Sequence, residues 1–292
     1  MTTVHEYSDK TVTSESAADA KIQLAFADDG AIAIIALNEP TLGNPMSPEM
    51  GDAFSATVKQ LKEHDKLRAA IVRGAGKNFS VGGHRDMLSR LADPSMTSEA
   101  RHNFMLSFYD RWLTMLEVPV PVIAAIEGDC IGVAPIFACA SDISVADETA
   151  NFQITFAAIG LYPGMAMSYL VPKLVGAQRA ALLMVAGAPF SGREAAECGL
   201  VAKSAPRGTV HEEALKIARQ IAANAAEVVR PLTLAFRAKR SELQPTLESD
   251  ATRQAESYAT QEFRDRIAKY LPKWYDNQPQ FQMTKREKDL ST

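Results

Sequence analysis

Twice in this chain a strand-like apolar run passes into a helix through a stretch of small residues, and this feature constrains the fold most. The first stretch is Lys77–His84 (KNFSVGGH), after the apolar run at 69–72, and the second is Ile126–Ala140. Glycines permit close backbone approach, and the first N–H groups of a helix have no partner within it. Two such sites, about fifty residues apart, can converge on one carbonyl oxygen as an oxyanion hole. Taken alone, the first stretch can equally be interpreted as a simple tight turn.

Apolar periodicity predicts alternating strands and helices over the first two-thirds of the chain. Strands are expected at 21–26, 31–37, 69–72, 120–126 and 143–146, with another starting at Phe152. Helices are expected at 48–63, 84–91, 98–116, 165–174, 177–185, 193–198, 208–226, 228–243, 247–259 and 261–270. This order is typical of an α/β protein built from strand–strand–helix units. The amphipathic helices of the last third must pack on the core or on another subunit.

Composition excludes several classes of protein. The 292 residues are 47% apolar and carry a net charge of −4, which argues against a nucleic-acid partner. No apolar run approaches the about 18–20 residues of a membrane span, and the polar N-terminus has no apolar signal core. The three cysteines lie in apolar or helical surroundings, which predicts buried reduced thiols and a cytoplasmic location.

Five short segments occur in an order and spacing that together resemble one family. They are LNEPTLGN at 37–44, FSVGG at 79–83, Gly128 and Gly132 ahead of Asp142-Ile143, GLYPG at 160–164, and AAECGLV at 195–201. These segments resemble the crotonase (enoyl-CoA hydratase/isomerase) superfamily, and the resemblance covers roughly residues 20–275. It implies a crotonase-like ββα spiral with a helical C-terminal trimerisation region, assembled as a homotrimer or a dimer of trimers. It also implies a coenzyme A thioester as substrate and no metal.

The resemblance divides the chain and places its binding groups. It implies a flexible tail over 1–18, a ββα core with the acyl-CoA site over 19–207, and a helical region over 208–292. The backbone N–H groups of Gly83 and Val133 would hold the thioester carbonyl, although Val133 replaces a family glycine. The expected coenzyme A contacts are Leu42, Asn44, Val81 and, in the basic tail, Lys273.

The chain departs from the family pattern at the positions that carry its chemistry. Hydratases of the family use two glutamates, and Ile136 and Phe156 stand at those positions here. Neither side chain can transfer a proton, so syn-hydration by the usual pair is not expected. The dehalogenase aspartate and the decarboxylase tyrosine of other branches both fall at Gly164. An apolar pocket lined by Ile136, Phe156 and Tyr109 would favour an apolar or aromatic acyl group.

Two residues are candidates for an atypical acid or base. His84 follows the first expected amide donor and titrates near neutral pH, and Tyr162 lies in the turn near the expected pocket. The plainer interpretations are that His84 caps a helix and that Tyr162 packs with its hydroxyl satisfied.

Three hypotheses follow for the function of the chain. The first is an enzyme that stabilises a thioester enolate in an oxyanion hole, and decarboxylation is then the least demanding reaction because it needs no base. Double-bond isomerisation, retro-Claisen cleavage and hydration of an activated substrate fit as well. The second is a non-catalytic acyl-CoA-binding protein, and the third is a structural subunit without a ligand.

Overall fold

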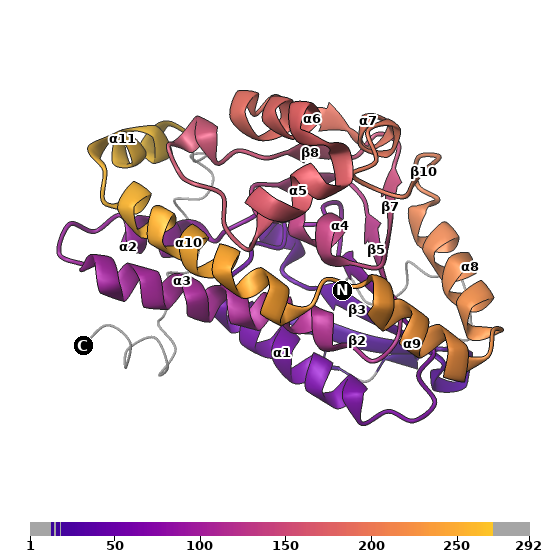
Figure 1. The fold of residues 1–292 in the computed structure, drawn as a ribbon. Coiled ribbons are helices and arrows are strands. Elements are labelled where there is room, and N and C mark those ends of the chain that lie inside the picture. The colour runs from indigo at the N-terminus through magenta and orange to yellow at the C-terminus, as the bar shows by residue number, and fades with distance from the viewer. Residues whose placement is uncertain (1–12, 15, 18, 271–292) are drawn as a thin grey trace.

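The computed structural model of the protein describes residues 13–14, 16–17 and 19–270. Its main sheet has seven strands in the order β1-β2-β3-β4-β5-β7-β10 (Figure 1). These strands are β1 (Thr13–Ser14), β2 (Ile22–Ala27), β3 (Ile32–Leu37), β4 (Ala69–Gly74), β5 (Val122–Ile126), β7 (Ile143–Asp147) and β10 (Lys203–Ala205). The first three strands pair antiparallel, and β3 through β10 pair parallel. A second sheet, β6-β8-β9, consists of β6 (Asp129–Ile131), β8 (Asn151–Gln153) and β9 (Phe190–Ser191).

The central strands are apolar on both faces because both faces of the main sheet are covered. In β3, Ile35 and Leu37 belong to one core cluster, whereas the alternate residues Ile32 and Ile34 belong to another. This is the period of two that a pleated strand imposes on its side chains. The apolar run expected at 31–37 is therefore a doubly buried strand.

The helices cover the sheet and extend beyond it. They are α1 (Pro48–Lys62), α2 (Arg85–Leu91), α3 (Ser98–Trp112), α4 (Ile136–Ala140), α5 (Met167–Val175), α6 (Ala177–Ala181), α7 (Gly192–Glu197), α8 (Val210–Ala222), α9 (Ala226–Phe236), α10 (Arg240–Tyr258) and α11 (Gln261–Tyr270). Short 3-10 turns occupy Asp28–Gly30, Pro40–Leu42, Leu113–Glu117 and Ala157–Ile159, and Leu182–Ala186 is a π-helical turn. The expected N-cap of α1 is present, because Met50 N donates to Ser47 Oγ at 3.2 Å.

Two C-terminal helices pack on segments from earlier in the chain. Helix α10 packs along α3, and α11 packs on the turn at Ala157–Ile159 (Figure 1). Helix α8 instead packs on the main sheet, where Val210, Ala214 and Ala218 join the same core cluster as Ile32. The helical region expected from residue 208 therefore begins with a helix that belongs to the core.

The expected flexible tail over 1–18 is wrong for part of its length. Thr13 and Ser14 pair with Phe26 and Ala25 of β2, and Leu24 N donates to Ser16 Oγ at 2.9 Å. The strand pairing and this side-chain bond hold the segment on the edge of the sheet, whereas residues 1–12 lie outside the described residues. Across the described part of the chain, no helix has the length and apolarity to cross a membrane. The same residues contain no group of three or more His, Cys, Asp or Glu side chains that could hold a metal ion.

Candidate active site

The two small-residue stretches lie side by side as the glycine pattern predicts. Ser80 and Cys130 form a parallel bridge, in which Ser80 N donates to Asp129 O at 2.9 Å and Ile131 N donates to Ser80 O at 3.0 Å. Gly82 has φ +89°, and a Cβ on it would lie 2.6 Å from Ile131 O. Only glycine fits such a close approach, so the sequence at this position fixes how near the two stretches come.

Two backbone amides, those of Gly83 and Val133, lie on the wall of one cavity of about 400 Å³. Neither N–H donates a hydrogen bond among the described residues. Each of the four neighbouring amide N–H groups does donate a hydrogen bond, to an acceptor at 2.8–3.1 Å. These are the amides of Gly82, His84, Gly132 and Ala134. Buried N–H groups are rarely left without a partner. Gly83 is half-buried and Val133 is buried, and their two N–H groups are donors that the described residues leave unused.

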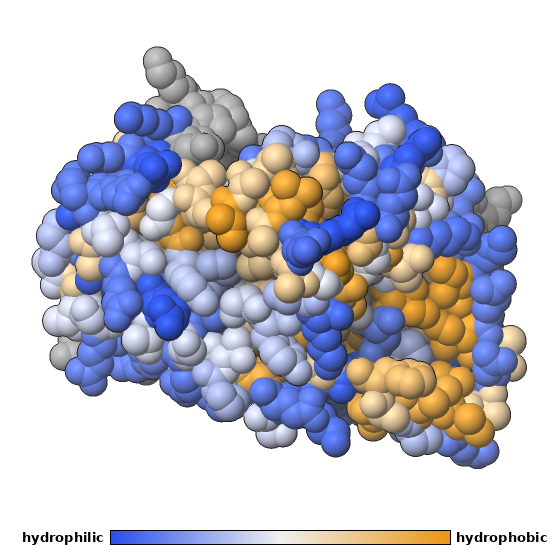
Figure 2. All heavy atoms as spheres, turned by 45° about the horizontal axis from the view of Figure 1, so that its top comes forward, coloured by the Kyte–Doolittle hydropathy of each residue, from blue (hydrophilic) through white to orange (hydrophobic). Residues whose placement is uncertain are grey.

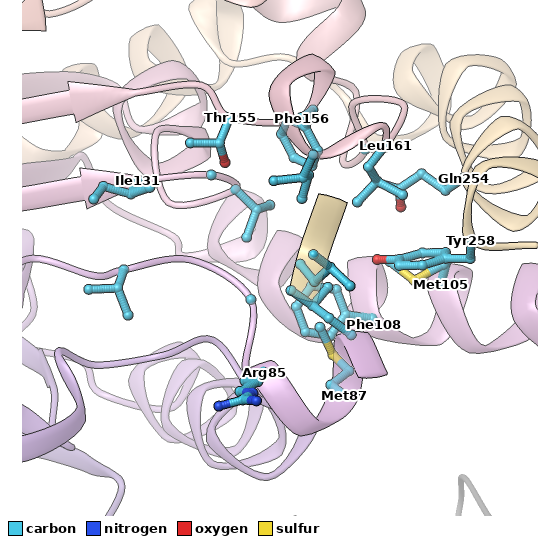
Figure 3. Close-up of a pocket in the computed structure, with 18 of the residues that line it drawn as sticks. Arg85, Met87, Met105, Phe108, Ile131, Thr155, Phe156, Leu161, Gln254 and Tyr258 are labelled. Carbon is cyan, nitrogen blue, oxygen red and sulfur yellow. The ribbon is translucent and has the colours of Figure 1, made fainter. Parts of the chain in front are cut away.

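The cavity wall is mainly apolar. Its apolar side chains include Met87, Met105, Phe108, Phe156, Leu161 and Ile267, several of which surround the space in Figure 3. Within the described part of the wall there is no glutamate, and Asp129 is the one carboxylate. Asp129 is half-buried and accepts a hydrogen bond from Asn151 Nδ2 at 2.8 Å. The wall therefore offers very little proton-transfer capacity.

The residues expected in the pocket are divided between the wall and the core. Phe156 and Tyr109 line the cavity, whereas Ile136 is not among the described lining residues. Ile136 is fully buried at the first position of α4 and belongs to the main apolar core. Its side chain therefore packs in the core that supports the cavity.

Tyr109 is held by a hydrogen-bond chain that the sequence did not reveal. Its hydroxyl donates to Gln254 Oε1 at 2.5 Å, and Gln254 Nε2 donates to the backbone oxygen of Tyr162 at 2.7 Å. Burial raises the pKa of Tyr109 well above its usual range, and the charge of Asp250 adds to this effect. Tyr109 is thus a neutral, engaged phenol on the wall.

Neither candidate acid or base is among the residues that line the described wall. His84 Nδ1 accepts a hydrogen bond from Asp86 N at 3.3 Å and so caps α2. Burial lowers the pKa of His84, which favours the neutral ring that this cap requires. Tyr162 is half-buried, and the guanidinium of Arg253 lies 5.4 Å from the centre of its ring. The structure gives His84 the plainer of its two expected roles, and it places Tyr162 off the described wall with its ring against Arg253.

Of the residues expected to contact coenzyme A, some line the cavity and others do not. Val81 lines the cavity, whereas Leu42 and Asn44 are buried beside it and do not appear among the described lining residues. Asn44 Nδ2 donates to the backbone oxygens of Ala75 and Asn78 at 2.9 and 2.8 Å, and Asn44 Oδ1 accepts from Glu39 N at 2.8 Å. These bonds tie the loop after β3 to the loop after β4. Lys273 lies outside the described residues.

Helix α10 contributes three buried polar residues that the sequence analysis missed. Asp250, Gln254 and Tyr258 recur every four residues on its buried face. Asp250 accepts from Ala166 N and from Ser168 Oγ, both at 2.9 Å, and thereby holds a turn in which Ala166 has φ +59°. Burial raises the pKa of Asp250 to about 6. The spacing of these residues was visible in the sequence, but their partners lie about 80–145 residues away.

Comparison with known proteins agrees with this architecture. The model of the family "Enoyl-CoA hydratase/isomerase" matches residues 27–282. The chain is 29% identical over 189 residues to the 1,2-epoxyphenylacetyl-CoA isomerase of Escherichia coli K12, which covers 64% of this chain and 71% of that protein.

Two solved structures are also similar to this chain. A crystal structure of an enoyl-CoA hydratase/isomerase from Pseudoalteromonas atlantica T6c has a TM-score of 0.75 at 26% identity, covering 90% of this chain and 100% of that one. The enoyl-CoA hydratase from Bacillus halodurans shares the fold, with a TM-score of 0.75 at 20% identity, over 89% of this chain and 100% of that one. From its match to the family model over most of its length, the chain belongs to the enoyl-CoA hydratase/isomerase family.

Proposed function

We propose that this chain is an acyl-CoA-processing enzyme that stabilises a thioester enolate, with the N–H groups of Gly83 and Val133 as its oxyanion hole. The observation that carries the proposal is the pair of amides without a partner among the described residues, both on the wall of one apolar cavity. Hydrogen-bond donors fixed in a site with little water stabilise a developing oxyanion far better than water does.

The composition of the wall supports an atypical reaction within the family. Ile136 and Phe156 stand where the resemblance implies glutamates, and no glutamate is found on the described wall. Loss of carbon dioxide from a malonyl-type thioester generates the enolate without a base, so decarboxylation fits this wall best. Isomerisation, retro-Claisen cleavage or hydration would need a proton carrier, and Asp129 and Tyr109 are better placed for that role than His84 or Tyr162.

The acyl group is proposed to be apolar or aromatic. The aromatic rings of Phe108 and Phe156 and the thioether of Met105 lie on the wall, where they favour apolar contacts. The Escherichia coli relative is named for 1,2-epoxyphenylacetyl-CoA, a thioester whose acyl group carries a six-membered carbon ring, which agrees with an apolar acyl group.

The proposed assembly is a homotrimer or a dimer of trimers. Helix α9 exposes four large apolar side chains, of which Phe236 is 79% exposed, and the others are Val228, Leu232 and Leu234. Figure 2 shows hydrophobic side chains gathered on the right of one face, the side on which α9 lies in Figure 1. An apolar area of this kind is typical of a surface that contacts another subunit.

A second candidate function is binding of an acyl-CoA without turnover. It is favoured by the same lack of glutamate on the described wall and by the capping and packing roles of His84 and Tyr162. The two hypotheses share the ligand and differ in whether the bound thioester is converted.

A panel of thioesters tests both hypotheses. The purified protein is incubated with malonyl-, enoyl-, β-keto- and aryl-CoA thioesters, and the products are followed by mass spectrometry. Conversion of one class supports the enzyme, with loss of carbon dioxide as the expected result. Thermal stabilisation by a thioester that is not converted would support the binding protein, and no binding by any thioester would refute both.

A further inference from the structure

The hydroxyl of Tyr258 has no hydrogen-bond partner among the described residues, unlike the side chains of Asp250 and Gln254 on the same face of α10. Tyr258 is 1% exposed and lines the cavity. Its ring packs edge-on against Phe263 with 5.0 Å between the ring centres. Its oxygen is not one of the fully buried unpartnered atoms of the described residues, so it faces the open space of the cavity. Figure 3 shows this hydroxyl pointing from α10 toward the interior of the cavity.

The surroundings of Tyr258 do not supply the missing acceptor. Gln254, one turn earlier on α10, uses its oxygen for Tyr109 and its nitrogen for the backbone of Tyr162. Tyr109, the second phenol on the wall, is thereby satisfied, whereas Tyr258 is not. A molecule that fills the cavity and displaces its water can therefore supply an acceptor for Tyr258.

The position of Tyr258 separates it from the two amides of the proposed oxyanion hole. In Figure 3, Ile131 and Thr155 lie on one side of the cavity, and Tyr258 and Gln254 lie on the other. Val133 lies two residues after Ile131 in the chain, with Gly132 between them. A thioester carbonyl held at Val133 would therefore direct the remote part of its acyl group toward Tyr258.

The chemistry of the wall selects the kind of acceptor. Burial raises the pKa of Tyr258 above its usual range, so the group is a neutral donor. Arg85 is the one cationic side chain on the described wall, and Figure 3 places it away from Tyr258. A carboxylate at this end of the cavity would lack a counter-charge, whereas a ketone, ether or hydroxyl oxygen would not need one.

We propose that Tyr258 is a specificity-determining residue, which donates a hydrogen bond to a neutral oxygen on the remote part of the acyl group. The proposal rests on the proposed function, because it takes the occupant of the cavity to be an acyl-CoA. The substrate class becomes narrower: an apolar acyl chain or ring that carries one neutral oxygen beyond the thioester.

Matched thioesters test the proposal on the full-length protein. Octanoyl-CoA is compared with 5-, 6- and 7-oxooctanoyl-CoA, which move one ketone along a chain of constant length. Calorimetry gives the Kd of each for the wild type, for Tyr258→Phe and for Tyr169→Phe, a control on the exposed face of α5. We expect one oxo position to bind the wild type about 5- to 20-fold more tightly than octanoyl-CoA. Tyr258→Phe should abolish this preference, because octanoyl-CoA then binds as tightly as the oxo thioesters or more tightly, while Tyr169→Phe should keep the preference.

The outcomes separate this proposal from the proposed function. Thioesters that bind with the same preference in the wild type and in Tyr258→Phe would overturn the role of Tyr258 and leave the acyl-CoA site standing. Binding of none of the four by a protein that binds another thioester of the panel would refute the role of Tyr258 alone, and binding of no thioester at all would refute the proposed function as well. Tyr258→Phe removes an oxygen that has no partner among the described residues, so its thermal unfolding should match that of the wild type. The preference of the wild type for one oxo position is itself an independent test of the proposal, because it can be measured without any variant.

Discussion

Replacement of Val133 by proline would remove one of the two proposed oxyanion donors. The Val133 N–H donates no hydrogen bond among the described residues, so its loss breaks no bond of the fold. The preceding residue is a glycine with φ +65°, which tolerates the restriction that proline places on its neighbour better than a β-branched residue would. Val133 is also a buried side chain of the main core, so we expect the free energy of unfolding to fall by about 1–3 kcal/mol.

The effect on the thioester carbonyl should be much larger. Loss of one oxyanion donor lowers kcat by roughly 10²- to 10³-fold, or about 3–4 kcal/mol. Binding can be followed without turnover through a conjugated probe such as 4-dimethylaminocinnamoyl-CoA, whose absorption moves to longer wavelength when its carbonyl is polarised. The wild type should produce this shift, and Val133→Pro should lose most of it.

Val133→Ala is the matched control for the proline variant. It keeps the N–H and shortens the side chain, so the spectral shift should stay while the affinity changes by a small factor. A folded Val133→Pro protein that binds the probe with the full shift and keeps wild-type turnover would refute the assignment of Val133 as a donor.

Three further predictions concern the parts of the molecule that support the cavity. Asn44→Ala should lower the free energy of unfolding by about 3 kcal/mol or more, measured by urea denaturation, because it removes the side-chain bonds between two loops at a residue with φ +56°. The pKa of Asp250 rises from 3.8 to about 6 on folding, so its contribution to stability is full below about pH 4 and is lost as the pH rises through 6. The loss should reach about 2–3 kcal/mol at neutral pH, and Asp250→Asn should abolish this pH dependence in urea titrations. Phe236→Glu should reduce the mass found by sedimentation without unfolding the protein, and an unchanged mass would argue against α9 as an interface.

Most elements of the fold could be predicted because apolar periodicity reports burial directly. The run at 31–37 became β3, and Ser47 capped α1 as expected. Strands β1, β6, β9 and β10 were missed because they have only two, three, two and three residues, too few to show a period of two.

The candidate site could be predicted where it depends on the main chain. The glycine pattern indicated that two stretches would meet, and Gly82 packs against Ile131 as that pattern requires. Side-chain directions were harder to predict, because they depend on packing between distant segments. His84 follows the first donor in sequence, yet the ring nitrogen serves the next helix. Tyr258 reaches the cavity only because α10 packs along α3, a contact that no local pattern contains.

The two amides at Gly83 and Val133 belong to the main chain, and this has a consequence for how such a protein evolves. A codon change at Phe156, Leu161 or Tyr258 alters the cavity wall and leaves both N–H groups in place. At Val133 itself, every encoded residue except proline keeps the donor. A gene copy can therefore accumulate substitutions around the cavity and exchange one acyl group or proton carrier for another while the two proposed donors are inherited intact.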